Sequence, residues 1–116
     1  MYPRAARITR RQDIDRIRKE GRTLKTSGLV LRVSSSPFSF LRVGLVVPRY
    51  GQTAVRRNQV KRRLRELVRR ELLALPGNRD VVIWALPPAY RMTLEDLALT
   101  LRQLARRMGE GRTPAT

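Results

Sequence analysis

The sequence predicts a single α+β domain, and three observations indicate this fold class. A chain of 116 residues can bury one hydrophobic core but is too short for two. Three stretches repeat apolar residues every three or four positions, as amphipathic helices do. Other stretches alternate apolar and polar residues or run apolar throughout, as strands do. We therefore expect helices and one sheet within a single domain, residues 1–116.

The first predicted element is a helix over residues 10–20. Ile14 and Ile17 repeat at helical spacing and give it a thin apolar side. Thr9 is a possible N-cap because its hydroxyl can accept from a free backbone N–H, and Gly21 is a natural stop.

Three strands can be predicted from the apolar pattern. Residues 28–34 and 40–47 alternate side chains at strand spacing and are separated by a Ser-rich turn ending in Pro37, so we expect them to form a hairpin. Residues 80–86 form an apolar run typical of a strand covered on both faces. That strand is expected at the centre of the sheet.

Two further helices are predicted in the second half. Thr53 is a plausible N-cap for a helix that begins at residue 54, and its core-facing side consists of Val60, Leu64, Leu67, Val68, Leu72 and Leu75. Thr93 and Asp96 resemble a capping box that opens the last helix. The apolar side of that helix consists of Leu94, Leu97, Ala98, Leu101, Leu104, Ala105 and Met108.

The helix over residues 54–70 carries the strongest functional signal. Between residues 56 and 70 it contains eight basic residues and one acid. One face gathers Asn58, Lys61, Arg62, Arg65 and Arg69, whose like charges repel one another at spacings of three and four. Glu66 and Glu71 interrupt the cations, and both are expected outside this face. A solvated charged surface is the ordinary explanation, but the scarcity of compensating acids favours a face that binds phosphate.

Charge and composition favour binding over catalysis. The net charge is +17, and 23 of the 26 cations are arginine, whose planar fork suits phosphate and can stack on bases. The chain has no cysteine and no histidine, which excludes disulfides, thiolate metal sites and histidine bases. The nine carboxylates are scattered, and no P-loop or Rossmann fingerprint is present.

The ends of the chain and its hydropathy bear on location. Residues 1–8 and 109–116 are expected to be mobile arms. No apolar run approaches the roughly 18 residues of a membrane span, and residues 1–11 lack a hydrophobic signal region, so we expect a cytoplasmic protein.

RNA is the favoured partner. Duplex DNA binding would call for a helix-turn-helix or zinc-finger pattern, and the sequence has neither. Two alternatives stay open: a ribosomal or other structural RNA-binding protein, and a basic helix lying on an anionic membrane. The membrane alternative would leave the apolar side of that helix exposed in solution.

The run A-V-R-R-N-Q-V-K-R-R-L-R-E resembles the signature of the bacterial ribonuclease P protein component. Its residues in register are Arg57, Asn58, Lys61, Arg62, Arg65 and Glu66. The resemblance extends from about Ile8 to Met108 and includes R-V-G-L-V-V and D-V-V-I-W-A. It implies an α/β sandwich of order αβββαβα, with the basic helix in an uncommon left-handed crossover and an additional short strand near residues 22–25.

The resemblance also implies a function. In that family a catalytic RNA cleaves the 5′ leader from precursor tRNA with Mg²⁺, and the protein binds both the RNA and the leader. This chain would then be the RNA-binding subunit of an endoribonuclease, with no catalytic side chain of its own and with Mg²⁺ held mainly by the RNA. Asn58 is a candidate for an indirect Mg²⁺ contact through a water. The expected RNA-binding residues are Arg56, Arg57, Asn58, Lys61, Arg62, Arg65 and Arg69.

The leader is expected in a cleft between the first helix and the sheet, where relatives offer aromatic rings. The corresponding positions here are Ile14, Arg18 and Arg32, and none is aromatic. Arginine planes can also stack on bases. Arg49 and Tyr50 are further candidates, although Tyr50 is equally well explained by packing within its loop.

Overall fold

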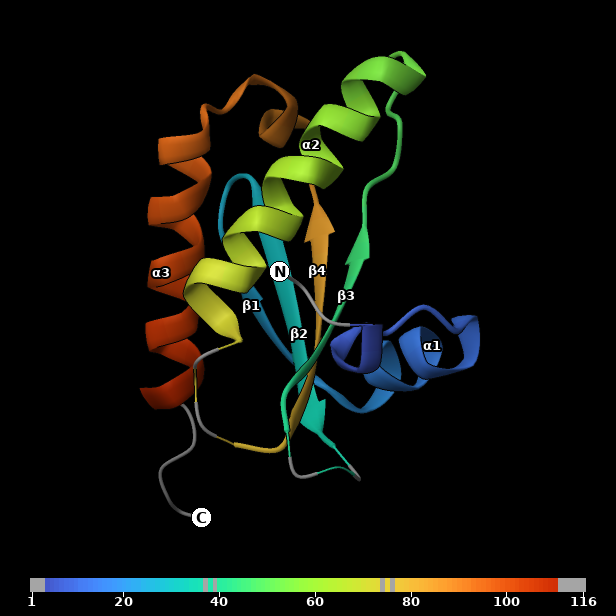
Figure 1. Cartoon of the computed structure of the whole chain (residues 1–116), viewed down its shortest axis with the longest axis vertical. Coiled ribbons are helices and arrows are strands. Elements are labelled where there is room, and N and C mark those ends of the chain that lie inside the picture. The colour runs from blue at the N-terminus through green and yellow to red at the C-terminus, as the bar shows by residue number, and fades with distance from the viewer. Residues whose placement is uncertain (1–3, 37, 39, 74, 76, 111–116) are drawn as a thin grey trace.

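The structure is a computed structural model that describes residues 4–36, 38, 40–73, 75 and 77–110. Three α-helices and four strands follow one another in the order αβββαβα (Figure 1). They are α1 (Arg11–Glu20), β1 (Arg22–Lys25), β2 (Leu29–Ser35), β3 (Arg42–Val46), α2 (Ala54–Leu67), β4 (Arg79–Ala85) and α3 (Leu94–Glu110). This order, including the short strand β1, confirms the expectation drawn from the resemblance.

The sheet has the strand order β1-β2-β4-β3. The predicted hairpin between residues 28–34 and 40–47 is wrong, because β4 lies between β2 and β3. Three successive residues of β4, Val81–Ile83, are fully buried, and such a strand is stabilised in the interior of a sheet rather than at its edge. The hairpin partner of β2 is instead β1, joined through a turn in which the Leu29 N–H donates to the Thr26 hydroxyl at 3.1 Å.

The chain passes from β3 through α2 to β4 by a left-handed crossover. β3 and β4 are adjacent and parallel, and α2, which connects them in the chain, crosses in front of the sheet (Figure 1). Nearly all such connections are right-handed, so this handedness is a distinguishing feature of the fold. After Leu67 the helix continues as one π-helical turn, Val68–Leu72, in which the Leu73 N–H donates to the Val68 carbonyl at 3.0 Å.

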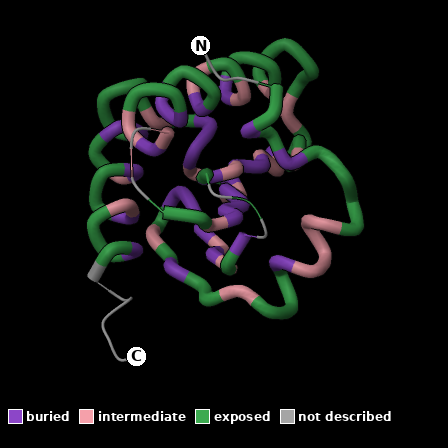
Figure 2. The backbone as a smooth tube through the Cα atoms, turned by 60° about the horizontal axis from the view of Figure 1, so that its bottom comes forward, coloured by how far each residue is buried: buried purple, intermediate pink, exposed green. Residues whose placement is uncertain are grey.

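Helices cover the two faces of the sheet unequally. α2 and α3 lie on one face and build the larger core, which contains the predicted α2 residues Val60, Leu64, Leu67, Val68 and Leu72. Figure 2 shows the buried stretches of the backbone, in purple, gathered toward the middle of the molecule. On the other face α1 and the N-terminal segment build a small cluster, in which Ile17 packs with Ile8 and Val82. Partly buried side chains at the border of this cluster are Ile14, Val46 and Trp84. In the described chain, no helix is both long enough and apolar enough to cross a bilayer.

The N-terminal segment differs from its prediction. Residues 4–8 are not an arm but pack on β3: the Ile8 N–H donates to the Val43 carbonyl at 2.9 Å, and Ile8 is buried. Gly44 makes this approach possible, because a Cβ there would lie 2.9 Å from the Ile8 carbonyl oxygen. Gly109 belongs to α3. Residues 1–3 and 111–116, also expected to be mobile, lie outside the described residues.

The ends of the helices show which caps were predicted correctly. Thr9 does not cap α1; its N-cap is Arg10, which makes no side-chain capping bond. Gly21 ends α1 as predicted, but in an extended conformation, and a Cβ there would lie 2.5 Å from the Ile17 carbonyl oxygen. The capping box of α3 is confirmed, with Thr93 and Asp96 bonding reciprocally at 3.2 and 3.0 Å.

A buried carboxylate ties α1 to the sheet. Asp80, at the start of β4, is fully buried and accepts from Arg42 of β3 at 2.9 and 2.7 Å and from Arg16 of α1 at 2.7 Å. Burial raises the pKa of the Asp80 carboxyl, but the hydrogen bonds from Arg42 and Arg16, the positive charge of Arg42 and a hydrogen bond from Ser36 together outweigh burial. They hold that pKa below its ordinary value of 3.8.

We predict that Asp80→Asn lowers the free energy of unfolding by about 3 kcal/mol at neutral pH, because two guanidinium groups lose a buried partner. Since the folded-state pKa of Asp80 is lowered, its stabilisation is present above the unfolded-state value and is lost as the pH falls through the folded-state value. Urea unfolding of both proteins from pH 7 downward should show the wild-type curve approaching that of the variant in acid.

Glu20→Gln is the matched control. Glu20 also pairs with Arg16, at 3.7 Å, but its side chain is 63% exposed. Exposed ion pairs contribute little to stability, so this variant should unfold like the wild type. Equal losses for the two variants would contradict a special role for Asp80.

Candidate nucleic-acid interface

The start of α2 is fixed by its cap and by the loop before it. The Thr53 hydroxyl accepts from the Arg56 N–H at 3.2 Å, as predicted. The preceding loop is bonded to the sheet and the turn after it: Tyr50 donates its hydroxyl to the Ala85 carbonyl, and Tyr90 donates to the Pro48 carbonyl, both at 2.6 Å. The basic helix therefore begins at a position determined by several independent bonds.

Three arginines of α2 are anchored to backbone carbonyls. Arg57 donates through Nε to the Val47 carbonyl at 2.7 Å, and Arg56 donates through Nη2 to the Tyr90 carbonyl at 2.8 Å. Arg63 donates to the Met92 carbonyl at 3.3 Å. These side chains hold α2 against the chain around it, in addition to contributing positive charge.

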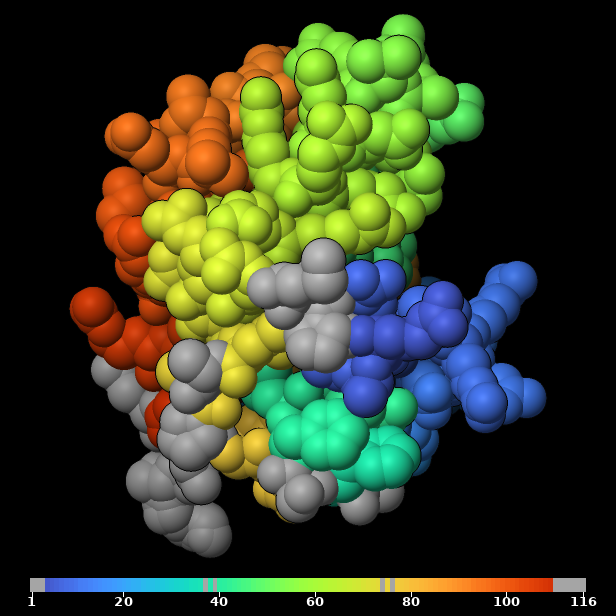
Figure 3. All heavy atoms as spheres, in the orientation of Figure 1, coloured from blue at the N-terminus to red at the C-terminus, as the bar shows by residue number. Residues whose placement is uncertain are grey.

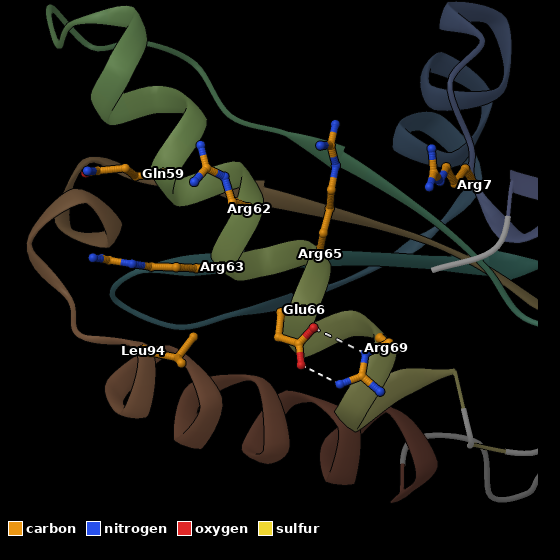
Figure 4. A pocket seen from close by; sticks show the side chains of 8 residues that line it. All are labelled: Arg7, Gln59, Arg62, Arg63, Arg65, Glu66, Arg69 and Leu94. Carbon is orange, nitrogen blue, oxygen red and sulfur yellow. Dashed lines mark hydrogen bonds and ion pairs between the residues drawn. The ribbon is translucent and has the colours of Figure 1, made fainter. Parts of the chain in front are cut away.

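Asn58, Arg62 and Arg65 point outward from the same helix. All three are exposed, and Figure 4 shows Arg62 and Arg65 extending away from α2. Lys61, next to them, is half-buried; burial lowers its pKa, and repulsion from Arg57 and Arg65 lowers it further. An anion placed beside Lys61 would relieve that repulsion.

Glu66 lies closer to this face than the sequence suggested. It forms an ion pair with Arg69 and lines, with that residue, a surface depression of about 680 Å³. The other lining residues are Arg7, Gln59, Arg62, Arg63, Arg65 and Leu94 (Figure 4). The hydrogen bond from Arg69 lowers the pKa of Glu66, which keeps the carboxylate charged. Glu71 lies elsewhere and pairs with Arg102 of α3 at 3.1 Å.

Seen from outside, the α2 side chains form a continuous surface next to the N-terminal segment (Figure 3). A smaller depression of about 230 Å³ joins α2 to α1, and its lining includes Lys61, Arg65 and Ile14. The basic face and the expected leader cleft therefore meet at the N-terminal segment, where Arg7 lines both depressions. Arg7 was not among the predicted site residues, because residues 1–8 were expected to be a mobile arm.

The expected cleft residues do not form one cluster. Ile14 packs at the border of the α1 cluster, and Arg32 lies on the same face of the sheet. Arg18 is exposed on α1. Arg49 and Tyr50 lie in the loop at the far end of β4, where Tyr50 has a φ of +50° and donates its hydroxyl to the carbonyl of Ala85, the last residue of β4.

The protein groups that could hold a metal are limited. The described residues contain no cluster of three or more acids that could bind an ion. On the exposed surface of α2 the arginines only donate, so a metal-bound water could donate there to the amide oxygens of Asn58 and Gln59 or to the Glu66 carboxylate.

The strand order, the left-handed crossover and the outward arginines define a class: a small basic α+β protein that presents one cationic helix. The ribonuclease P family model matches residues 2–109. A ribonuclease P protein component from Nocardioides is 43% identical over 103 residues, covering 87% of this chain and 86% of the relative. One from Mycobacterium avium is 37% identical over 119 residues, covering 98% and 100%. The chain belongs to the ribonuclease P protein family.

Solved structures show the same fold. The RNase P protein of Staphylococcus aureus superposes with a TM-score of 0.82 at 25% identity, covering 90% of this chain and 96% of that one. The Thermotoga maritima protein superposes with a TM-score of 0.78 at 30% identity, covering 87% and 96%.

We predict different effects on stability for anchored and outward arginines. Arg57→Ala should lower the free energy of unfolding by about 1 kcal/mol, because the carbonyl of buried Val47 loses a charged donor. Arg65→Ala should change it by less than about 0.5 kcal/mol, as expected of an exposed residue. Chemical denaturation measures both values, and equal destabilisation would show that Arg57 does not anchor the helix.

Proposed function

We propose that this chain is the protein subunit of ribonuclease P. In this proposal α2 binds the catalytic RNA, a cleft beside α1 receives the 5′ leader of precursor tRNA, and the complex performs Mg²⁺-dependent 5′ maturation of tRNA. The observation that carries the proposal is the exposed group of Asn58, Arg62 and Arg65 on an anchored helix, in register with the family motif.

The outward residues have distinct roles. Arg62 and Arg65 can each hold a phosphate through two parallel N–H bonds, which neutralises charge and fixes orientation. Lys61 acts as a point charge beside them. The Asn58 amide can accept from a water on Mg²⁺ or from a 2′-hydroxyl, while Mg²⁺ itself, held by the RNA, supplies the activation of water for hydrolysis.

The proposed leader cleft runs along the less covered face of the sheet. α1 covers one end of that face through Ile17, and Arg32 lies beside it on β2. A single-stranded leader needs cations for its backbone and planar groups for its bases. The arginine at position 32 supplies both kinds of contact.

Two alternatives are weaker. A structural RNA-binding protein would share the charge and the size, but the family match extends over residues 2–109. A helix lying on a membrane would need an exposed apolar side, whereas Val60, Leu64 and Leu67 of α2 are buried in the core.

Reconstitution tests the proposal. The chain, combined with a bacterial ribonuclease P RNA, should restore cleavage of precursor tRNA at Mg²⁺ concentrations too low for the RNA alone, because the cations of α2 replace some of the charge screening that Mg²⁺ provides. The RNA without protein and the protein without RNA are the controls. Absence of stimulation at every Mg²⁺ concentration would reject the proposal.

We predict that Arg65→Ala weakens binding to the catalytic RNA and reduces the slope of log affinity against log salt by about one unit for each phosphate that α2 no longer neutralises. Fluorescence anisotropy across a salt series measures both quantities. Arg106→Ala, which removes an exposed arginine from α3, is the matched control for net charge. If the two variants show the same fall in affinity and slope, binding reflects overall charge and not the α2 face.

A further inference from the structure

We propose that Trp84 is the aromatic surface on which a base of the leader stacks. This inference rests on the proposed binding of a leader and adds a residue to it. The cleft residues expected from the resemblance, Ile14, Arg18 and Arg32, are not aromatic, so an aromatic stacking surface in the cleft must come from another position. Trp84 is the single tryptophan of the chain.

Trp84 lies on the correct face of the sheet. It is two residues after Val82 on β4, so both side chains point to the face that α1 covers. Its neighbours in register are Val30 of β2 and Val46 of β3. α1 lies near the start of β4 and the end of β2 (Figure 1), so the ring is placed beyond the end that α1 covers.

The ring is held in place while part of it stays accessible. Trp84 is half-buried and packs at the border of the cluster formed by Ile8, Ile17 and Val82. A fixed ring loses little conformational entropy when a ligand stacks on it. Bases of any type can stack on such a surface, which suits a substrate whose leaders differ in sequence.

Arg32 places its guanidinium charge over the Trp84 ring. Its Cζ atom lies 6.0 Å from the centre of the Trp84 ring, within the range of a cation–π contact. Its Nη1 donates to the Thr23 hydroxyl at 3.1 Å, whereas its buried Nε has no hydrogen-bond partner among the described residues. A turn of the guanidinium toward a phosphate would therefore gain a hydrogen bond without breaking an ion pair.

The position along the cleft fits a single strand of RNA. On one side the ring meets the α1 cluster, to which Ile14 belongs; on the other it precedes Ala85, whose carbonyl accepts from Tyr50. A strand passing over Trp84 would thus run from α1 toward the loop that carries Arg49. Ile14 at α1 and the loop that carries Arg49 and Tyr50 lie at opposite ends of the sheet, and Trp84 lies between them.

The test uses the reconstituted enzyme with precursor tRNA and with the same tRNA lacking its leader. Trp84→Leu should weaken precursor binding by about 10-fold, since it removes the stacking on one base, and should leave mature tRNA binding unchanged. Trp84→Phe keeps a ring and should recover most of the affinity. Precursor tRNA should also quench the emission of the single tryptophan in the wild-type complex more than mature tRNA does.

The outcomes separate the two proposals. If the wild type prefers precursor to mature tRNA and Trp84→Leu keeps that preference in full, the leader cleft stands and the role of Trp84 is rejected. If the wild type shows no preference, leader binding itself is rejected, and the role of Trp84 with it. If Trp84→Leu does not fold, the quenching measured on the wild type decides alone, and equal emission with both tRNAs would reject the role of Trp84.

Discussion

The ion-pair cluster around Asp80 is the constraint on which the arrangement of α1, β3 and β4 depends. Asp80 is the only acidic side chain buried in the described part of a chain of net charge +17, and it binds arginines from two other elements. Without it, Arg16 and Arg42 would repel each other at the edge where α1 meets the parallel strands. One carboxylate on β4 therefore allows cations on two other elements, Arg16 of α1 and Arg42 of β3, to lie close together.

Local patterns in the sequence predicted the individual elements better than their pairing. The spacing of Val60, Leu64 and Leu67 identified the buried side of α2, and Thr53 identified its start, because both depend on neighbours within one turn. The order of the strands depends on contacts between residues far apart, and a hairpin was the natural but wrong expectation for two successive strands. β1 has four residues, and only Leu24 is buried, which is too little for a periodic signal.

In the candidate site, too, features that depend on one helix could be predicted from the sequence, whereas features that depend on distant residues could not. The outward position of Asn58, Arg62 and Arg65 could be predicted because all three lie on one helix. That Arg57 is bonded to the carbonyl just after β3 could not, since the bond depends on where that strand ends. Trp84 went unnoticed for a related reason: its place in the cleft requires knowing which strands flank β4. Trp84 lies two residues after Val82, so once the strand pairing is known this spacing places both side chains on the same face of the sheet.

If an RNA docks on α2 as proposed, the bonds that fix the start of this helix determine whether the protein or the RNA changes its conformation. Asn58 and Arg65 are seven positions apart, which places them about 10 Å apart along a rigid helix axis. Three bonds hold the start of this helix in place: those from the hydroxyls of Tyr50 and Tyr90 and from the guanidinium of Arg57. A docking RNA therefore meets a preformed template, and most of the entropy lost in shaping the complex is lost by the RNA.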